Sequence, residues 1–417
     1  MEKTGEQQIY EDIFAPAAME FAAWILDQSV KDGTERLYFL ARDGYQIWLA
    51  AKTTAEKKRI PVECRYLEGS RFAWRLPQYG LLGDRAIDMI CTGGIDVTLR
   101  KILRRGGLDE AETVKTAEEL GLENDLDRKL TYSETTGLSA ALKKSATLRR
   151  CIKSRSEEAR ENALGYFRQE GLFDNVRYAV ADSGWTGSIQ QTLGELLDIE
   201  KPGISKELRG YYFGLYQLPE GADKERYSAF YFEPYKDIGR KARFSNCLFE
   251  AVFSEPRGMT LGYEKRDGRF VPVRETEYNP NRERIEKNID TLKNMLACED
   301  FTEKHSVKKT GEAMKRMERL MSRPGKEEAE IMGSYLFSDD VHGTHLQKAA
   351  RDLTEDEIKA HHPLRRLLLM KGIVKGELAD SAWIEGSVAK YGKHTAWHLL
   401  NARIYKYIIY IRKRIRG

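Results

Sequence analysis

Two short turns in the sequence place an aspartate beside or close to a glycine at the end of an apolar run. They are Arg42-Asp43-Gly44 and Asp182-Ser183-Gly184. Such an aspartate can cap the free N–H groups of the helix that follows. Alternatively, two such aspartates on neighbouring strands can hold Mg²⁺ while the helix N-terminus holds a phosphate group. The occurrence of both turns favours a shared site in which Asp43 and Asp182 are the catalytic and metal-binding carboxylates.

The residues around these aspartates suit a phosphate ligand. Hydroxyl groups that follow Asp182 can donate hydrogen bonds to phosphate oxygens, and glycines in both turns let a ligand approach the backbone. The hydroxyl residues are Ser183, Thr186 and Ser188, and the glycines are Gly44, Gly184 and Gly187.

Two residues near these turns have open interpretations. Trp185 can stack on a sugar or a base, or it can pack in the core. Glu250 lies in the apolar segment 249–258, where it is either a further carboxylate of the site or a buried partner of an arginine. The sequence alone decides neither question.

Histidine is absent from residues 1–304, and all seven histidines follow that stretch. Serine or cysteine catalysis with a histidine base is therefore excluded from the first two thirds of the chain. The pair His342 and His345 and the neighbours His361 and His362 lack the pattern of a zinc site. We expect the histidines to lie at the surface or at helix ends, and we assign no metal to them.

The elements that position the candidate residues alternate between strands and helices. Four apolar runs predict strands, and a charged stretch between the second and third predicts a helical insertion around 84–170. The predicted strands are 36–41, 61–67, 176–181 and 208–215, the last completing the sheet. This alternation predicts an α/β fold with a Rossmann-like parallel sheet and flanking helices. Ligands of such sheets bind at the carboxyl ends of the strands, where the three turns at 42–44, 69–71 and 182–184 should meet.

Composition and charge limit the class of protein. No stretch approaches the ~20 apolar residues of a membrane-spanning helix. Five scattered cysteines predict neither a disulfide framework nor a zinc site, which indicates the cytoplasm. The net charge is +4, and removing the six basic residues of segment 403–417 leaves 4 − 6 = −2. The body is therefore not expected to bind nucleic acid.

The basic tail 403–417 combines its cations with tyrosine and isoleucine and contains no acidic residue. This combination suits the inner face of an anionic membrane, where each Lys or Arg contributes about 1 kcal/mol. The alternative is a C-terminal helix that docks on the body and leaves its basic end in solvent. We expect peripheral contact with the inner leaflet of the cell membrane.

Three motifs resemble the haloacid dehalogenase-like (HAD) superfamily, as found in proteins of bacterial capsule and O-antigen polysaccharide biosynthesis. They are segment 41–45 (Ala-Arg-Asp-Gly-Tyr), Ser70-Arg71 with Leu76-Pro77, and segment 182–190 (Asp-Ser-Gly-Trp-Thr-Gly-Ser-Ile-Gln). The resemblance covers at least residues 36–275. It implies a HAD-like domain over 1–275 and leaves 276–417 as a helical C-terminal region.

The resemblance also implies roles for single residues. Asp43 matches the general acid/base, Asp182 a metal-binding aspartate, and Ser70 a phosphate-binding hydroxyl. Ala41, however, stands where the family has its aspartate nucleophile, and Thr186 stands where it has a last aspartate. A covalent aspartyl-phosphate is therefore not available. The lysine of the third motif is not identifiable among Lys143, Lys144 and Lys153.

The chain can still catalyse transfer or hydrolysis of a phosphate group without a covalent intermediate. Asp43 and Asp182 can hold Mg²⁺ against a diphosphate, while Arg42 and Arg71 neutralise its charge. The resemblance then implies a hydrolase or transferase acting on a phosphorylated sugar or nucleotide-sugar. The alternative is a catalytically inactive module that binds a sugar phosphate or serves as a scaffold for a glycosyltransferase partner.

Overall fold

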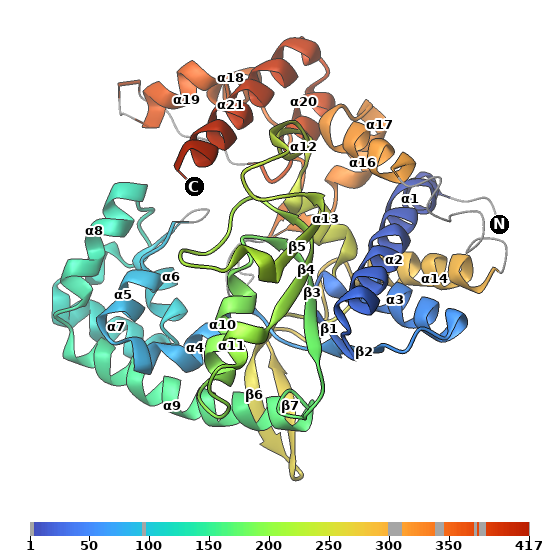
Figure 1. The fold of residues 1–417 in the computed structure, drawn as a ribbon. Helices are drawn as coiled ribbons and strands as arrows, with labels where there is room; N and C mark the ends of the chain where they lie inside the picture. The colour runs from blue at the N-terminus through green and yellow to red at the C-terminus, as the bar shows by residue number, and fades with distance from the viewer. Residues whose placement is uncertain are drawn as a thin grey trace.

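The computed structural model describes residues 4–93, 97–298, 311–337, 346–370, 373–374 and 381–416. At its centre lies a sheet of five parallel strands in the order β2-β1-β3-β4-β5 (Figure 1). The strands are β1 (Arg36–Leu40), β2 (Glu63–Leu67), β3 (Tyr178–Trp185), β4 (Arg209–Leu215) and β5 (Tyr227–Phe232). The predicted α/β class with a Rossmann-like parallel sheet is confirmed at this level.

Strand β1 lies inside the sheet, and all five of its residues are buried. Leu37 and Phe39 join the core on one face of the sheet, whereas Tyr38 and Leu40 join the core on the other face. This alternation follows from the two-residue period of a strand. Burial on both faces explains why the strand is an uninterrupted run of large apolar and aromatic residues after Arg36.

Helices cover both faces of the sheet. α2 (Ala15–Asp32) and α3 (Gly44–Lys58) pack on the face that carries Leu37 and Phe39. The opposite face is covered by three helices, which lie across the sheet from α2 and α3 in Figure 1. These are α4 (Arg71–Leu82), α9 (Ala146–Gln169) and α10 (Ser188–Leu197). Helices α3, α4 and α10 each begin close to the carboxyl end of a strand, so three helix N-termini face the same edge.

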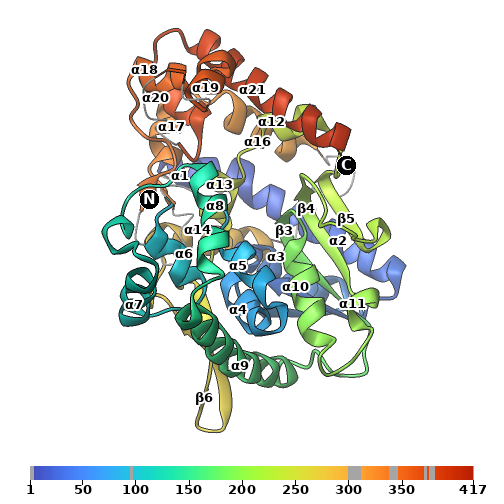
Figure 2. The same cartoon turned by 90° about the vertical axis from the view of Figure 1, so that its left-hand side faces the viewer.

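The long connection between β2 and β3 is helical, and α4 and α9 form its first and last helices. Ile87, Ile102 and Leu148 contribute to a separate hydrophobic core within this connection. Figure 2 shows these helices in front of the sheet, with α9 running along their base. The helices between α4 and α9 are α5 (Asp84–Ile90), α6 (Leu99–Arg105), α7 (Glu110–Leu120) and α8 (Tyr132–Leu142).

The C-terminal third is also mainly helical, and its two halves pack in different places. Leu292 and Met317 from the first half join the core beneath α2 and α3. Ile358, Val388 and Ala402 from the second half form a small core of their own. The helices are α14 (Arg282–Ala297), α16 (Glu312–Ser322), α17 (Lys326–Gly333), α18 (Glu355–Ala360), α19 (Pro363–Met370), α20 (Ile384–Tyr391) and α21 (Thr395–Arg416).

Two details of the predicted sheet are wrong. β4 does not complete the sheet, because β5 pairs along it; Gly214 of β4 leaves room for the ring of Phe232, which a Cβ would approach to 2.5 Å. β3 also continues beyond Ala181, since Asp182 pairs with Tyr212 and Trp185 pairs with Leu215. Asp182 therefore lies within a strand rather than in a turn after it.

Within the described ranges, no helix combines the length and the apolar character needed to cross a bilayer.

Candidate functional site

Asp43 and Asp182 meet at the carboxyl edge of the sheet. β1 and β3 are paired neighbours with Phe39 opposite Ala181, so the turn that follows β1 lies beside the part of β3 that carries Asp182. A Cβ on Gly44 would lie 3.9 Å from the carbonyl oxygen of Ala181. The first turn of α3 therefore lies directly beside the strand that carries Asp182.

Asp43 occupies the N-cap position of α3, but its side chain makes no capping hydrogen bond. The capping interpretation of this aspartate is therefore wrong. Its carboxylate has no ion pair among the residues that the structure describes, which leaves it available to a ligand.

The Asp182 carboxyl group is destabilised in its charged form. Burial and the negative charge of Asp43 raise its pKa well above the usual value for aspartate, and Glu250 raises it further. The backbone N–H groups of Ser183 and Gly184 oppose this shift, but they do not cancel it. This effect of Asp43 on Asp182 indicates that the two carboxylates lie near one another.

Glu250 is the third carboxylate of this edge, and it lies on α13 (Asn246–Phe253). Burial, followed by the charge of Asp43, raises its pKa to about 7, although Arg71, Arg42 and a hydrogen bond from Trp185 lower it in part. That hydrogen bond joins the indole nitrogen of Trp185 to a carboxylate oxygen of Glu250 at 2.5 Å. Among the described residues, Glu250 forms no ion pair with an arginine. We call Asp43, Asp182 and Glu250 the carboxylate cluster.

Arg42 and Arg71 are close enough to the cluster to affect Glu250 electrostatically. In the described part of the chain, neither guanidinium makes a hydrogen bond or an ion pair. Arg71 is exposed at the first position of α4, while Arg42 is half-buried. Arg42 and Glu250 together line a cavity of about 210 Å³, whose other walls include Ser254, Met259 and Tyr278. Among the described residues, two arginines without an ion pair thus lie near three carboxylates without an ion pair.

Three of the four predicted phosphate-binding hydroxyls already have protein partners. The Ser70 hydroxyl accepts from the backbone N–H of Ala73 at 3.0 Å, capping α4, and donates to the carbonyl oxygen of Thr260 at 2.6 Å. The Thr186 and Ser188 hydroxyls lie 3.1 Å apart and share a hydrogen bond. Ser183 is buried in β3.

Two of the predicted glycines are required by packing. Gly184 has φ 109°, and a Cβ there would approach the carbonyl oxygen of Gly214 to 2.6 Å. Gly187 has φ 63°, and a Cβ there would approach the ring of Tyr227 to 2.7 Å. The close approach at both positions comes from neighbouring strands, which explains these glycines without any ligand.

Trp185 packs among aromatic side chains. Its ring centroid lies 5.3 Å from that of Phe244, 5.7 Å from that of Phe249 and 5.9 Å from that of Tyr216. The core interpretation of this tryptophan therefore describes its position in the structure. In addition, the hydrogen bond from Trp185 fixes the orientation of the Glu250 carboxylate.

A second charged group lies at the same edge, after β2, and sequence reasoning missed it. Glu68 accepts from Arg274 at 2.5 Å and from Arg257 at 2.7 Å, and Arg257 also pairs with Glu255 at 3.0 Å. Arg274 belongs to β7 (Arg269–Arg274), which forms a hairpin with β6 (Thr260–Arg266). We call Glu68, Glu255, Arg257 and Arg274 the paired cluster. Since Glu68 lies far along the sequence from Glu255, Arg257 and Arg274, no local sequence pattern predicts the paired cluster.

The carboxylate cluster suits Mg²⁺ in charge and in ligand type. Mg²⁺ is commonly held by one or two carboxylates together with water and substrate phosphates. Asp43 and Asp182 supply two such carboxylates, and their mutual repulsion would be relieved by a cation. In the ranges that the structure covers, no three His, Cys, Asp or Glu side chains converge as a complete protein-only metal site.

The described histidines lie far along the chain from this edge. His398 is buried, but it lies in the first turn of α21, which fits the expected position at a helix end, and His362 shares a hydrogen bond with it at 3.0 Å between ring nitrogens. His361 ends α18 and is also buried. His305, His342 and His345 lie outside the described residues.

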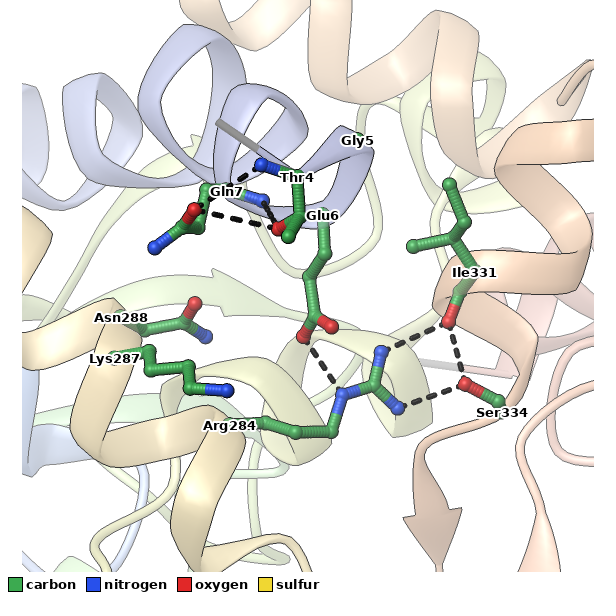
Figure 3. A pocket seen from close by; sticks show the side chains of 9 residues that line it. All are labelled: Thr4, Gly5, Glu6, Gln7, Arg284, Lys287, Asn288, Ile331 and Ser334. Carbon is green, nitrogen blue, oxygen red and sulfur yellow. Dashed lines mark hydrogen bonds and ion pairs between the residues drawn. The ribbon is translucent and has the colours of Figure 1, made fainter. Parts of the chain in front are cut away.

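A larger cavity of about 500 Å³ lies away from the sheet edge, between α1 (Gly5–Ile9), α14 and α17. Figure 3 shows that Arg284 spans it, donating to Glu6 at 2.7 Å, to Ser334 at 2.8 Å and to the Ile331 carbonyl oxygen at 2.9 Å. Because this guanidinium is fully engaged, Lys287 is the one cation of the lining that the described residues leave to a ligand. The carboxylate cluster is the stronger candidate site.

No protein-family model matches the sequence, and no curated protein is significantly similar to it. The HAD-like resemblance therefore stays a prediction, and the functional argument depends on the geometry described above.

Proposed function

We propose that this chain is a Mg²⁺-dependent hydrolase or transferase acting on phosphorylated sugars or sugar diphosphates in bacterial cell-surface polysaccharide biosynthesis. One observation carries the chemical part of this proposal. Three carboxylates and two arginines gather at the carboxyl edge of a parallel sheet, and none of the five forms an ion pair within the described residues. The polysaccharide context comes from the motif resemblance alone.

In this proposal Asp43 and Asp182 hold the metal ion. Mg²⁺, when bound, would neutralise charge on the phosphate oxygens. Arg42 and Arg71 would bind further phosphate oxygens through their planar guanidinium groups. The substrate would thus be fixed between the cluster and the first turns of α3 and α4, where backbone N–H groups favour an anion.

The reaction in this proposal is a direct displacement at phosphorus, because Ala41 offers no nucleophile. The oxygen of water or of an acceptor hydroxyl forms a bond to phosphorus, and the bond to the leaving oxygen breaks. The proton of the attacking hydroxyl passes to a carboxylate. The sequence favours Asp43 as this base, but Glu250, with a pKa of about 7, is better matched to proton transfer near neutral pH.

A second candidate function is a catalytically inactive module that binds a sugar phosphate or serves as a scaffold for a glycosyltransferase. The alanine at the position of the family nucleophile favours it. Such a module would use the same arginines and carboxylates for binding, with no turnover.

The test is a thermal-unfolding screen with nucleotide-sugars, sugar phosphates and polyprenyl-phosphate analogues, each with and without Mg²⁺. A ligand at about 100 times its dissociation constant should add about 2.7 kcal/mol of stability. Each stabilising ligand is then incubated with the protein and followed by ³¹P NMR.

Matched variants test whether the Mg²⁺-dependent shift arises at the proposed site. Asp43→Asn and Asp182→Asn should abolish the Mg²⁺-dependent shift, while Glu264→Gln, at a half-buried carboxylate of the β6–β7 hairpin that pairs with Arg266, should preserve it. New phosphorus resonances support the enzyme, and binding without them supports the module. A shift that survives in both aspartate variants contradicts the proposed site.

A further inference from the structure

The C-terminal helix α21 packs on the body through one side. Lys406 pairs with the buried Glu385 at 2.6 Å, and the ring of Tyr410 stacks on that of Tyr216 at 5.2 Å. Ala402 is buried in the core that α21 shares with α18 and α20. The helix is therefore anchored along its length, and it runs along the edge of the molecule in Figure 2.

The opposite side of α21 is an apolar stripe exposed to solvent. Its members are between 41% and 79% exposed, and their average spacing matches the 3.6-residue period of a straight helix. We call this set the α21 stripe, and it consists of Trp397, Leu400, Ile404, Ile408, Ile411 and Ile415. An apolar face of this length on a docked helix is a typical interaction surface.

The charge of the helix indicates what covers the stripe. α21 contains no acidic residue, and Arg412 and Arg414 are exposed. At about 100° per residue these two arginines project on opposite sides of the stripe. Cations that flank an apolar face, with a tryptophan near one end, match the layers of an anionic bilayer surface, with phosphate groups above acyl chains.

Self-association fits these features less well. A coiled-coil seam repeats every 3.5 residues and uses flanking charges of both signs, whereas the α21 stripe follows 3.6 and the charged residues beside it are all basic. A flat surface matches a straight stripe better than a second helix wound around it.

We propose that α21 is a peripheral membrane-docking helix, which lays its stripe on an anionic bilayer while its other side stays attached to the body. Ile404, Ile408 and Ile411 would enter the boundary between headgroups and acyl chains. Arg412 and Arg414 would contact lipid phosphates. This inference depends only on α21 and does not require the proposed enzymatic activity.

The position of α21 gives this docking a consequence for the candidate site. Tyr216, on which Tyr410 stacks, contacts the ring of Trp185 at 5.9 Å, and Trp185 donates to Glu250. The bilayer would thus lie near the carboxyl edge of the sheet. If the proposed function also holds, this placement favours a substrate whose phosphate is linked to a lipid.

The experiment is co-sedimentation of the full chain with vesicles of phosphatidylcholine alone or with about 30 mol % phosphatidylglycerol, without Mg²⁺ or sugar. We expect binding to the anionic vesicles only, weakened by salt. Ile404→Gln/Ile408→Gln/Ile411→Gln should reduce the partition coefficient at least about tenfold, and Arg412→Gln/Arg414→Gln should also reduce it at least about tenfold.

The matched control removes three exposed apolar side chains elsewhere, at Val30, Leu81 and Ile199. Val30→Gln/Leu81→Gln/Ile199→Gln should bind as the wild type does, and circular dichroism should show that all variants are folded. The proposal is overturned if the wild type does not sediment with anionic vesicles, or if the triple isoleucine variant still does. It is also overturned if light scattering shows a dimer that this variant converts to a monomer while vesicle binding is unchanged.

Discussion

Two groups of charged residues lie at the carboxyl edge of the sheet, and they differ in how their charges are matched. In the paired cluster, Glu68 and Glu255 accept from Arg257 and Arg274 at 2.5 to 3.0 Å. In the carboxylate cluster, burial and mutual repulsion raise the pKa values of Asp182 and Glu250. The first arrangement ties the β6–β7 hairpin to the end of β2. The second retains charge repulsion that a bound cation would relieve.

This difference indicates a structural role for the paired cluster and a binding role for the carboxylate cluster, although both lie at one edge of the sheet. A charge that is matched by its neighbours stabilises the fold, and its removal should affect stability first. A charge without a counter-ion costs stability in the free protein and is an indicator of a functional site. Substitutions in the two clusters should therefore give opposite patterns of stability and ligand binding.

The largest expected effect is the loss of ligand binding in Asp182→Asn. The substitution removes one of two proposed metal ligands, so Mg²⁺-dependent affinity for a sugar diphosphate should fall by about 100-fold or more. The unfolding free energy without ligand should stay the same or rise, because the substitution removes a carboxylate whose charged form is destabilised in the folded protein. Calorimetric titration and thermal unfolding of the same sample measure both quantities. Equal ligand affinity in variant and wild type would contradict the assignment.

The reverse pattern is expected for Glu68→Gln in the paired cluster. Removing this carboxylate leaves Arg274 without its partner, and the unfolding free energy should fall by about 2–4 kcal/mol in urea denaturation. Ligand affinity should change little at a temperature where the variant is folded. Arg274→Met in the same background should cost less than it does in the wild type, which a double-mutant cycle detects.

A smaller and pH-dependent effect is expected for Glu250→Gln. In the folded state the pKa of Glu250 is raised from 4.5 to about 7, so the folded protein holds this proton more tightly than the unfolded chain does. The contribution to stability is therefore full below pH 4.5, and it is lost as the pH rises to about 7.

Glu250→Gln carries no charge at any pH, so it avoids this loss. It should be more stable than the wild type by up to about 3 kcal/mol at pH 8 and nearly equal to it at pH 4. Urea denaturation at the two pH values gives the comparison. A constant difference would show that Glu250 does not titrate as described.

The smallest expected effect is that of Arg71→Gln. Arg71 is exposed and has no ion pair in the described structure, so its loss should leave the unfolding free energy unchanged. Affinity for a phosphorylated ligand should fall about tenfold, the effect of one charge-assisted contact. Arg150→Gln, at an exposed position of α9 without an ion pair in the described structure, is the matched control and should change neither quantity. A loss of stability in Arg71→Gln would show that Arg71 has a structural role like that of the paired cluster.

The sequence predicted the parts of the site that depend on strand ends. Asp43, Asp182, Arg42 and Arg71 each follow or end an apolar run, and a parallel sheet brings such residues to one edge. It also predicted the α/β class, since strand and helix patterns alternate clearly along residues 36–215.

Other features depend on tertiary contacts that no local pattern contains. Glu250 comes to the cluster on α13, held by Trp185, and Glu68 finds its partners in a hairpin some 200 residues later. The positions of Gly184 and Gly187 are explained by Tyr227 and by the backbone of Gly214 on neighbouring strands. β5 was missed as a member of the sheet because pairing along β4, rather than its own sequence, places it there.

The most direct test of the central claim is the unfolding free energy of the wild type at pH 8, measured with and without Mg²⁺. If the carboxylate cluster lacks a counter-ion and binds this cation, Mg²⁺ should stabilise the wild type and leave Asp43→Asn/Asp182→Asn unaffected. The stabilisation should shrink toward pH 5, where protonation of Glu250 and Asp182 competes with the metal. Equal stabilisation of the wild type and the double variant, or no stabilisation of either, would contradict the account.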